Sequence, residues 1–357
     1  MVTSIRAGKT RTLIYGAYGY TGRLTAELAA SRHVDVVLAG RNREALAPLG
    51  VRLNLPTRVV GLDDAEALAN ALHDVGSVIH MAGPFAITAQ PMLNACVRTQ
   101  TNYVDITGEI AVFEAIWSRR AEIERAGITV VPGSGFDVVP SDCVAALAAS
   151  QLERPSALLL AFRGLDSASR GTLQTAIRDV STPVLCRRGG KIVPLDDRSP
   201  RSFDFGSGAE PCLPVSWGDV ATAFYSTGAD DITVYFRQTA LLRSMAVAQR
   251  RFGRLLGSAL VQRGLAAAIR RAPEGPTEPE RRRHRTTVWA EAADRHGRRA
   301  RSALSTHDPY EFTANSVLEI THRIRALSTS LGVVTPSQAF GAEFALAMPG
   351  CRRVDVS

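Results

Sequence analysis

Cysteine is scarce in this sequence of 357 residues, which contains five. The five are far apart and none belongs to a Cys-x-x-Cys pair, which argues against both a disulfide framework and a zinc site. The seven histidines are equally scattered and form no His-Glu-x-x-His pattern, so we expect no bound metal. There is also no cysteine–histidine arrangement of the kind that forms a covalent intermediate.

Long apolar runs are missing as well. The longest candidate, residues 255–269, is interrupted by Gln262, Arg263 and Gly264 and falls short of the roughly 18 residues that a membrane span needs. The basic residues 1–11 lead straight into a predicted strand, without the apolar core or cleavage pattern of a signal peptide. We therefore expect a soluble, cytoplasmic protein, and the length indicates two domains.

Lysine is nearly absent. Of the 42 basic residues two are lysine, Lys9 and Lys191, and the rest are arginine, giving a net charge of +8. Much of the basic excess lies in residues 270–301, a polar stretch without interleaved aromatic residues, so we expect no nucleic-acid binding. A basic face for an anionic substrate, a carrier protein or a membrane surface is favoured instead.

A glycine-rich turn near the start of the chain organises the first half. Residues 12–28 show a short apolar strand, the turn Gly16-Ala17-Tyr18-Gly19-Tyr20-Thr21-Gly22 and the start of an amphipathic helix. Glycines at a spacing of three free the backbone and remove side chains where a pyrophosphate must approach. The helix that begins near Tyr20 offers backbone N–H groups to the phosphates. The sequence predicts the first βα turn of a dinucleotide-binding fold.

Arg41 indicates which dinucleotide is bound. The second predicted strand, residues 34–40, leads directly into Arg41, and no carboxylate lies between Asp35 and Glu44 to bind the ribose hydroxyls of NAD. A guanidinium at this place grips a 2′-phosphate, so we predict NADP(H); the alternative is a solvated surface arginine. Asp63 is a candidate contact to the adenine, and Asp64 a candidate N-cap of the helix predicted at 65–73.

Strands and helices alternate up to about residue 150. Further strands are predicted at 57–62, 77–82, from 102, and at 127–132, with helices at 20–31, 44–49, 65–73, 90–99 and 111–125. This pattern predicts an α/β fold with an N-terminal Rossmann-type, doubly wound parallel sheet over residues 1–150. The loops 82–85, 105–109 and 133–142 follow strands and so are expected at the carboxyl edge, where such sheets bind ligands. His80, inside a strand, is interpreted as a packed core residue.

The second half has a different pattern and predicts an α+β substrate domain over residues 151–328. Strands are expected at 157–165, 220–228, 231–236, 285–294 and 299–305, with hairpin turns at 230–231 and 295–297, a helix at 171–182 and a long loop at 186–216. A helix is expected at 310–326, and another begins after the N-cap Thr335. Residues 329–357 form a separate C-terminal segment.

The pattern of residues 238–271 predicts a pair of basic amphipathic helices, because apolar residues recur at helical spacing. The arginines of this segment are at 243, 250, 251, 254, 263, 270 and 271. Such helices suit a peripheral membrane contact or an acidic carrier protein. Helices that cover the sheet, or that make a homodimer contact, are the alternatives.

The motifs together resemble the saccharopine dehydrogenase-like oxidoreductases, most closely the trans-acting enoyl reductase branch. The matching stretches are 16–22, 82–85, 103–109, 135–142, 171–173, 289–292, 310–314 and 335–339. The resemblance implies an NADP-dependent reductase whose C-terminal segment returns to the first domain. It places Gly16, Gly19, Tyr20, Thr21 and Gly22 on the pyrophosphate, Arg41 on the 2′-phosphate, and Ala82, Gly83, Pro84 and Phe85 along the path to the nicotinamide. Tyr18 replaces the small polar residue usual in this family and is expected to change how the loop wraps the phosphates.

Several reactions remain open. Reduction of a C=C bond conjugated to a thioester, in a lipid or polyketide-like acyl group that is free or carrier-bound, needs an enolate to be stabilised and a proton to be supplied. Reduction of an imine C=N bond would be helped by a nearby carboxylate. A protein that binds NADP(H) as a redox sensor without turnover is the third reading. Catalytic candidates are Asp105, Glu109, Asp137 and Tyr310, although each carboxylate could instead cap a loop or helix. No Tyr-x-x-x-Lys pair is present.

Overall fold

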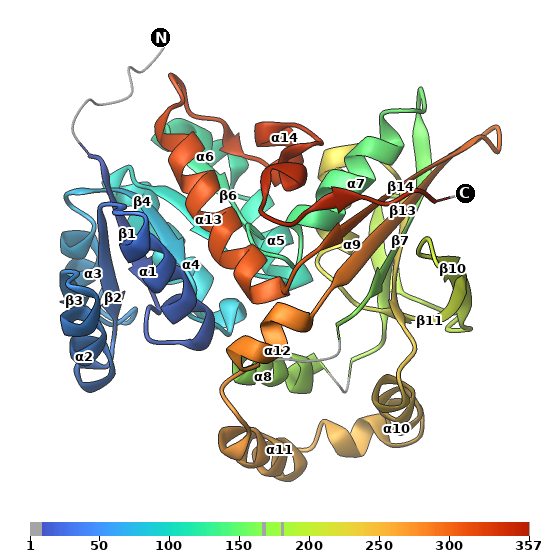
Figure 1. Ribbon diagram of the computed structural model, residues 1–357, viewed down its shortest axis with the longest axis horizontal. Coiled ribbons are helices and arrows are strands. Elements are labelled where there is room, and N and C mark those ends of the chain that lie inside the picture. Colours follow the sequence, from blue (N-terminus) through green and yellow to red (C-terminus); the bar gives the residue numbers. More distant parts are fainter. Residues whose placement is uncertain (1–8, 166–168, 180–181, 357) are drawn as a thin grey trace. The chain divides into compact units, whose positions relative to one another are not determined.

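The computed structural model describes residues 9–165, 169–179 and 182–356, and the chain forms two compact units (Figure 1). Unit 1 consists of the residues up to Val139 together with Pro309–Pro349, and unit 2 of Pro140–Asp308 together with residues from Gly350 onwards. These bounds differ from the predicted ones. Residues 140–150 lie in unit 2, residues 309–328 lie in unit 1, and the predicted C-terminal segment is divided at residue 350.

Unit 1 is built on a seven-stranded parallel sheet in the order β15-β6-β5-β4-β1-β2-β3. The predicted Rossmann-type parallel sheet is confirmed. The strands are β1 (Arg11–Tyr15), β2 (Val36–Gly40), β3 (Thr57–Val59), β4 (Val75–His80), β5 (Asn102–Asp105), β6 (Thr129–Val131) and β15 (Gly332–Val333). The helices are α1 (Tyr20–Ser31), α2 (Arg43–Leu53), α3 (Ala65–Ala71), α4 (Phe85–Thr99), α5 (Ile110–Trp117), α6 (Arg120–Ala126), α13 (Pro309–Arg325) and α14 (Pro336–Phe340).

Both faces of this sheet are covered, which is why its central strands are apolar throughout. Leu13 and Tyr15 of β1 pack with Leu68 of α3 and Met92 of α4 on one face. Ile14 points to the opposite face, because side chains alternate along a strand, and α1 and α13 lie there (Figure 1). The five residues of β2 are all buried.

The predicted helix at 111–125 is two helices, α5 and α6, and the helix predicted at 90–99 begins five residues earlier, at Phe85. Thr335 is confirmed as an N-cap. Its side chain accepts a hydrogen bond from the backbone of Gln338, and Pro336 occupies the first turn of α14.

Unit 2 contains a mixed sheet of nine strands, which confirms the predicted α+β character of the second half. The main path is β10-β11-β12-β7-β13-β14-β16; β8 pairs with β12 and β9. The strands are β7 (Pro155–Arg163), β8 (Leu185–Arg188), β9 (Lys191–Pro194), β10 (Arg201–Asp204), β11 (Ala209–Val215), β12 (Asp231–Arg237), β13 (Thr286–Asp294), β14 (Arg299–Thr306) and β16 (Arg352–Arg353). The helices are α7 (Val139–Ala149), α8 (Arg170–Asp179), α9 (Asp219–Thr227), α10 (Ala240–Leu256), α11 (Ala259–Arg271) and α12 (Glu278–Arg283).

Three predictions in unit 2 were wrong. The strand expected at 220–228 is the helix α9, which buries Val220, Ala221 and Ala223 and ends at Gly228 in the left-handed conformation (φ 72°). The turn at 230–231 therefore links a helix to a strand and is no hairpin. The loop expected at 186–216 holds four strands, because its glycines occupy the turns at 189–190 and 206–208, between β8 and β9 and between β10 and β11. The hairpin at 295–297 is confirmed, since β13 and β14 pair antiparallel across it.

The helix predicted at 171–182 corresponds to α8, and residues 180 and 181 of that prediction lie outside the described residues. Within the described part of the chain, no helix has the length and apolar character that crossing a bilayer requires.

Candidate functional site

The glycine turn between β1 and α1 is held by close backbone contacts. Gly16 adopts φ +82°, and a Cβ there would lie 2.9 Å from the backbone nitrogen of Ala82. A Cβ on Gly22 would lie 2.2 Å from the carbonyl oxygen of Gly16. The turn itself therefore requires glycine at both positions.

Gly19 is different, because it is exposed and a Cβ there would meet nothing closer than the Gly16 carbonyl oxygen at 3.3 Å. A side chain at Gly19 would project into the space in front of α1. The N-cap of this helix is Gly19 itself, which has no side chain to cap it, and the first turn of α1 begins directly behind it. A helix N-terminus behind an exposed glycine is a fitting cradle for phosphate oxygens.

The end of β2 brings together the predicted adenosine-side residues. The ring of Tyr18 lies over Gly40, where a Cβ would be 2.5 Å from Tyr18 Cε1. Arg41 follows, exposed and without an ion-pair partner among the described residues. Burial raises the pKa of Tyr15 to about 12. The nearby groups Tyr18, Arg41 and Asp63 also affect this pKa through their charges. Arg41 therefore directly follows the residue that the Tyr18 ring covers, and it is exposed to solvent.

Asp63 and Asp64 have different surroundings. The carboxylate of Asp64 accepts hydrogen bonds from the backbone of Glu66 (3.1 Å) and Ala67 (2.9 Å), so its role as the N-cap of α3 is confirmed. The carboxylate of Asp63 folds back over Gly61, where a Cβ would lie 2.2 Å from Oδ1. Asp63 thus remains the candidate for the adenine contact.

The loop after β4 lies against the glycine turn, as the contact between Gly16 and Ala82 shows. The chain proceeds from β1 to β2 on one side, while β4 lies on the other, so this is the switch point at which open α/β sheets bind ligands. Gly83 and Pro84 follow, and Thr88 Oγ1 holds the loop by donating to the Ala82 carbonyl (2.6 Å).

Two of the candidate carboxylates hold loops. Glu109 accepts hydrogen bonds from the backbone N–H groups of Phe85 (2.7 Å) and Ala86 (3.0 Å), and so caps α4. Asp105 is fully buried. Its oxygens accept from the Tyr103 hydroxyl (2.7 Å), Thr107 N (3.0 Å) and Gly133 N (2.8 Å). Burial raises the pKa of Asp105 to about 6, against the lowering effect of these bonds. These contacts join the loops after β4, β5 and β6.

Asp137 is placed differently. Its side chain is partly exposed, and Oδ2 lies close over Gly108, where a Cβ would be 3.1 Å away. Desolvation raises the pKa of Asp137 to about 7. Asp137 is therefore a carboxyl group at the carboxyl edge of the sheet that exchanges its proton near neutral pH.

The loop that carries Asp137 is positioned by α13. Phe136 N donates to Thr313 Oγ1 (3.0 Å), Ser316 Oγ donates to the Ser134 carbonyl (2.7 Å), and the rings of Phe136 and Phe312 meet edge to face at 5.9 Å. Thr313 and Ser316 were not identified from the sequence. The motif at 310–314 marked this stretch, but nothing in it indicated which loop the helix would contact.

Tyr310 lies beside Tyr20 rather than in a second domain. It is the second residue of α13, and its ring meets that of Tyr20 at the start of α1 edge to face, with centroids 5.0 Å apart. The structure thus gathers Gly16, Gly19, Tyr20, Ala82, Asp137 and Tyr310 in one unit. His80 is fully buried among the rings of Tyr15, Phe85 and Tyr103, and burial lowers its pKa to about 3, so it stays neutral.

Residues 12–131 match the family model of the saccharopine dehydrogenase NADP-binding domain. The match covers about a third of the chain, so this stretch is similar to that domain. The predicted resemblance and the predicted cofactor are confirmed at this level. The turn at Gly16–Gly22, Arg41 and the Ala82–Phe85 loop all lie inside this NADP-binding domain, and Asp137 follows it.

Curated relatives carry related names. The chain is 33% identical over 138 residues to the trans-acting enoyl reductase of Mycobacterium leprae, covering 36% of this chain and 33% of that protein. It is 25% identical over 150 residues to the saccharopine dehydrogenase-like oxidoreductase of Bos taurus, covering 36% and 35%. The chain spans about a third of the length of these relatives.

Two solved structures share the fold over almost the whole chain. The saccharopine dehydrogenase (L-Glu forming) of Saccharomyces cerevisiae has a TM-score of 0.60 at 14% identity, covering 97% of this chain and 100% of that one. The homospermidine synthase of Legionella pneumophila, solved with NAD, has a TM-score of 0.63 at 10% identity, covering 95% and 88%. At these identities the likeness shows the fold.

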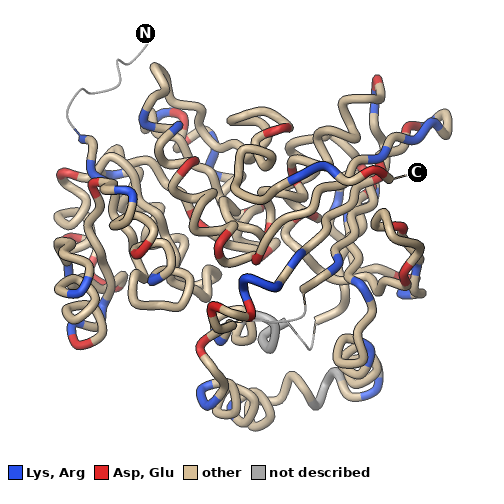
Figure 2. Tube along the Cα trace, viewed as in Figure 1, with Lys and Arg blue, Asp and Glu red and all other residues tan. Residues whose placement is uncertain are grey.

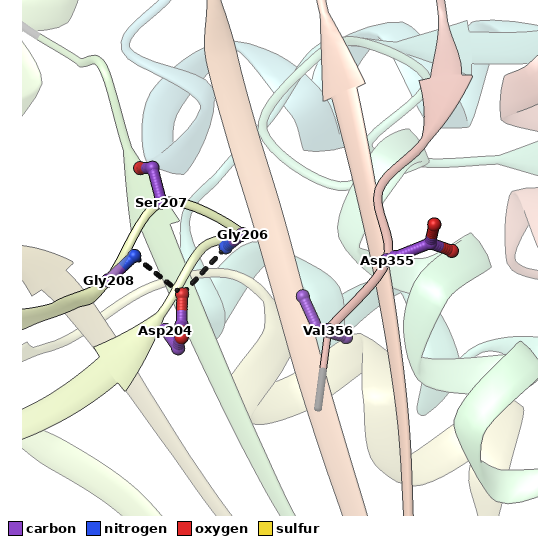
Figure 3. A pocket seen from close by; sticks show the side chains of 6 residues that line it. All are labelled: Asp204, Gly206, Ser207, Gly208, Asp355 and Val356. Atoms are coloured by element: carbon purple, nitrogen blue, oxygen red, sulfur yellow. Dashed lines mark hydrogen bonds between the residues drawn. The ribbon is translucent and has the colours of Figure 1, made fainter.

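A pocket of about 620 Å³ lies elsewhere, in unit 2, lined by Asp204, Gly206, Ser207, Gly208, Asp355 and Val356 (Figure 3). The Asp204 carboxylate accepts hydrogen bonds from Gly206 N (2.8 Å) and Gly208 N (3.0 Å) and so closes the turn between β10 and β11. The Asp204 carboxylate is therefore used to hold this turn.

Arg41 allows a direct test of cofactor choice. We expect Arg41→Asp to raise the Kd for NADPH by about 100-fold, because a charge-assisted contact is replaced by repulsion of the 2′-phosphate. The Kd for NADH, which lacks that phosphate, should change by less than about threefold. Fluorescence titration measures both. Arg52→Asp, an exposed arginine of α2, is the matched control, and equal losses for both nucleotides in Arg41→Asp would refute the assignment.

Proposed function

We propose that this chain is an NADPH-dependent reductase of the saccharopine dehydrogenase type that reduces a C=C bond conjugated to a thioester carbonyl. The observation that carries the proposal is Asp137, a partly exposed carboxyl group with a pKa raised to about 7 at the carboxyl edge of an NADP-binding sheet. The names of the mycobacterial relatives support the choice of an enoyl group.

The residues of unit 1 fit the cofactor. The open position at Gly19 and the uncapped start of α1 suit the pyrophosphate, and Arg41 suits the 2′-phosphate. Ala82 and its loop, in contact with Gly16, would border the nicotinamide half. When bound, NADPH supplies a hydride.

The protein must supply a proton. Saturating a conjugated C=C bond adds a hydride at the β-carbon and a proton at the α-carbon, and the electron pair passes through an enolate on the thioester. Asp137 gives its carboxyl proton and becomes a carboxylate, which takes up a proton from water before the next cycle. Asp105 and Glu109 hold backbone N–H groups of neighbouring loops, whereas Asp137 is chosen for this role because its side chain is partly exposed and its pKa lies near 7.

The test is a panel of acceptors. We expect the purified chain to oxidise NADPH in the presence of a medium-chain 2-enoyl thioester and to show no oxidation above background with cyclic imines. Oxidation with the imines alone would select the C=N reaction, to which an acid with this pKa is also suited. Tight NADPH binding without oxidation in either group would contradict a catalytic role and favour a redox-sensing protein.

A further inference from the structure

The helices α10 and α11 of unit 2 carry positive charge without negative charge. From Gln238 to Pro273 the sequence holds seven arginines, at 243, 250, 251, 254, 263, 270 and 271, and no aspartate or glutamate. In Figure 2 the two helices show basic segments and no acidic ones. Since the whole chain has a net charge of +8, most of its excess charge is concentrated here.

Apolar side chains are exposed on the same two helices. Leu241, Phe252 and Leu260 are 69%, 55% and 81% exposed, and Met245 and Val247 are exposed too. Leu241 and Met245 lie one turn apart on α10, and the chain kinks at Phe252 (φ −129°, ψ 17°). Exposed apolar residues close together on a soluble protein mark an interaction surface.

Contacts of the two helices with the rest of unit 2 include the side chain of Gln249 in α10, which donates to the carbonyl of Thr182. Ile269 of α11 is buried, and the guanidinium of Arg170, at the start of α8, donates to the carbonyl of Ala272 through Nε (3.2 Å) and Nη2 (2.7 Å). The backbone N–H of Arg170 also donates to the Glu274 carbonyl (3.0 Å). These contacts hold the end of α11 and leave Leu241, Phe252 and Leu260 outside the core.

We propose that α10 and α11 dock unit 2 on the surface of a membrane that contains anionic lipids. Arginines attract the acidic headgroups, and leucine and phenylalanine side chains insert at the boundary of the acyl chains. The exposed apolar side chains are spread over two helices and a kink. The continuous surface of a bilayer can contact all of them, whereas a single pocket on a protein partner would contact only some. The docking is independent of the proposed reduction, because it uses no residue of the candidate site.

The experiment is co-sedimentation of the full chain with vesicles. We expect binding to phosphatidylcholine vesicles that contain about one third phosphatidylserine and little binding to pure phosphatidylcholine. Binding should weaken as salt rises above about 0.1 M, where charges are screened beyond about 10 Å. Equal binding to both vesicle types, or binding to neither, would overturn the proposal.

Two variants separate the contribution of the arginine charges from that of the inserted apolar side chains. Arg243→Gln/Arg251→Gln/Arg263→Gln should lower partitioning by about 100-fold, at roughly fivefold for each arginine near the surface. Leu241→Ser/Leu260→Ser should lower it by at least about tenfold, through loss of the inserted side chains.

Matched controls keep the test specific. Arg52→Gln/Arg120→Gln/Arg125→Gln removes the same charge from exposed arginines of unit 1, and Val51→Ser removes a side chain that is 83% exposed in α2. Both controls should bind vesicles like the parent chain. Equal loss in test and control variants would overturn the proposal, and so would capture by an acidic carrier protein without vesicle binding. A circular dichroism spectrum and a Tm equal to those of the parent chain in every variant show that both units are folded.

Discussion

Replacement of Gly19 by valine is expected to abolish NADPH binding while leaving the protein folded. Gly19 has an extended backbone that any residue adopts, and its Cβ would lie 3.3 Å from the Gly16 carbonyl oxygen, a close contact that a shift of a few tenths of an ångström relieves; the branched side chain then fills the space in front of the first N–H groups of α1. Phosphate oxygens could no longer reach those donors, and the Kd for NADPH should rise by at least about 100-fold. Titration calorimetry measures the affinity, and thermal unfolding should show a Tm close to that of the parent.

Two other glycines serve as comparisons for Gly19→Val. Gly22→Ala should destabilise the chain itself, because its Cβ would lie 2.2 Å from the Gly16 carbonyl oxygen. Gly264→Ala, in the helix α11 where a Cβ meets nothing within 4 Å, should leave NADPH binding unchanged and raise stability by up to about 1 kcal/mol, because alanine favours a helix more than glycine does. Unchanged NADPH affinity in Gly19→Val would show that the pyrophosphate does not lie at this turn.

Replacement of Asp137 by asparagine is expected to lower kcat by about 100- to 1,000-fold, because the amide cannot give up a proton. In the parent chain the carboxyl group is protonated below its pKa, so the rate of reduction should fall as the pH rises through about 7. Asp137→Asn should lose this inflection. Its Kd for NADPH should be unchanged, since Asp137 is no part of the phosphate cradle. Steady-state kinetics across pH 5–9 with the accepted substrate would measure the effect.

Measurements of stability at different pH values distinguish a loss of catalysis in Asp137→Asn from unfolding of the variant. The pKa of Asp137 is raised above the 3.8 of an unperturbed carboxyl group, so its contribution to stability is present below about pH 4 and is lost as the pH rises to about 7. Asparagine carries no charge to desolvate, and the variant should be at least as stable as the parent above pH 7. Asp64→Asn is a suitable control, because asparagine caps a helix as well as aspartate does. An unchanged pH profile in Asp137→Asn would assign the proton to another group.

The parts of the fold that could be predicted are those where one residue determines the local backbone or where apolar runs alternate with turns. Gly16 and Gly22 are required by contacts inside a short turn, Thr335 and Pro336 determine the start of a helix, and buried parallel strands leave apolar runs such as residues 36–40. Prediction failed where the residue composition of a segment is compatible with both a strand and a helix. Residues 219–227 contain valine, threonine and aromatic residues that favour strands, yet they bury one face of a helix.

The candidate site was predicted less completely, because the roles of its carboxylates depend on distant partners. Asp105 and Thr107 have the spacing of a local Asx turn, and that part could be recognised from the sequence. The bond from Gly133 N to Asp105 and the bonds from Phe85 N and Ala86 N to Glu109 join loops that only the sheet order brings together. The sequence offered Asp105, Glu109 and Asp137 as equal candidates, and the structure shows that the first two hold neighbouring loops while Asp137 is partly exposed.

The division of the chain has a consequence for its synthesis on the ribosome. Unit 1 is interrupted by residues 140–308, so α13 and β15 emerge long after the glycine turn and β6 have been made. Until Thr313 and Ser316 appear, the backbone of Ser134 and Phe136 lacks the partners that hold the Asp137 loop. A nascent chain can therefore form the phosphate cradle early, but the carboxyl group proposed to supply the proton is set in place only after the inserted residues 140–308 have been made.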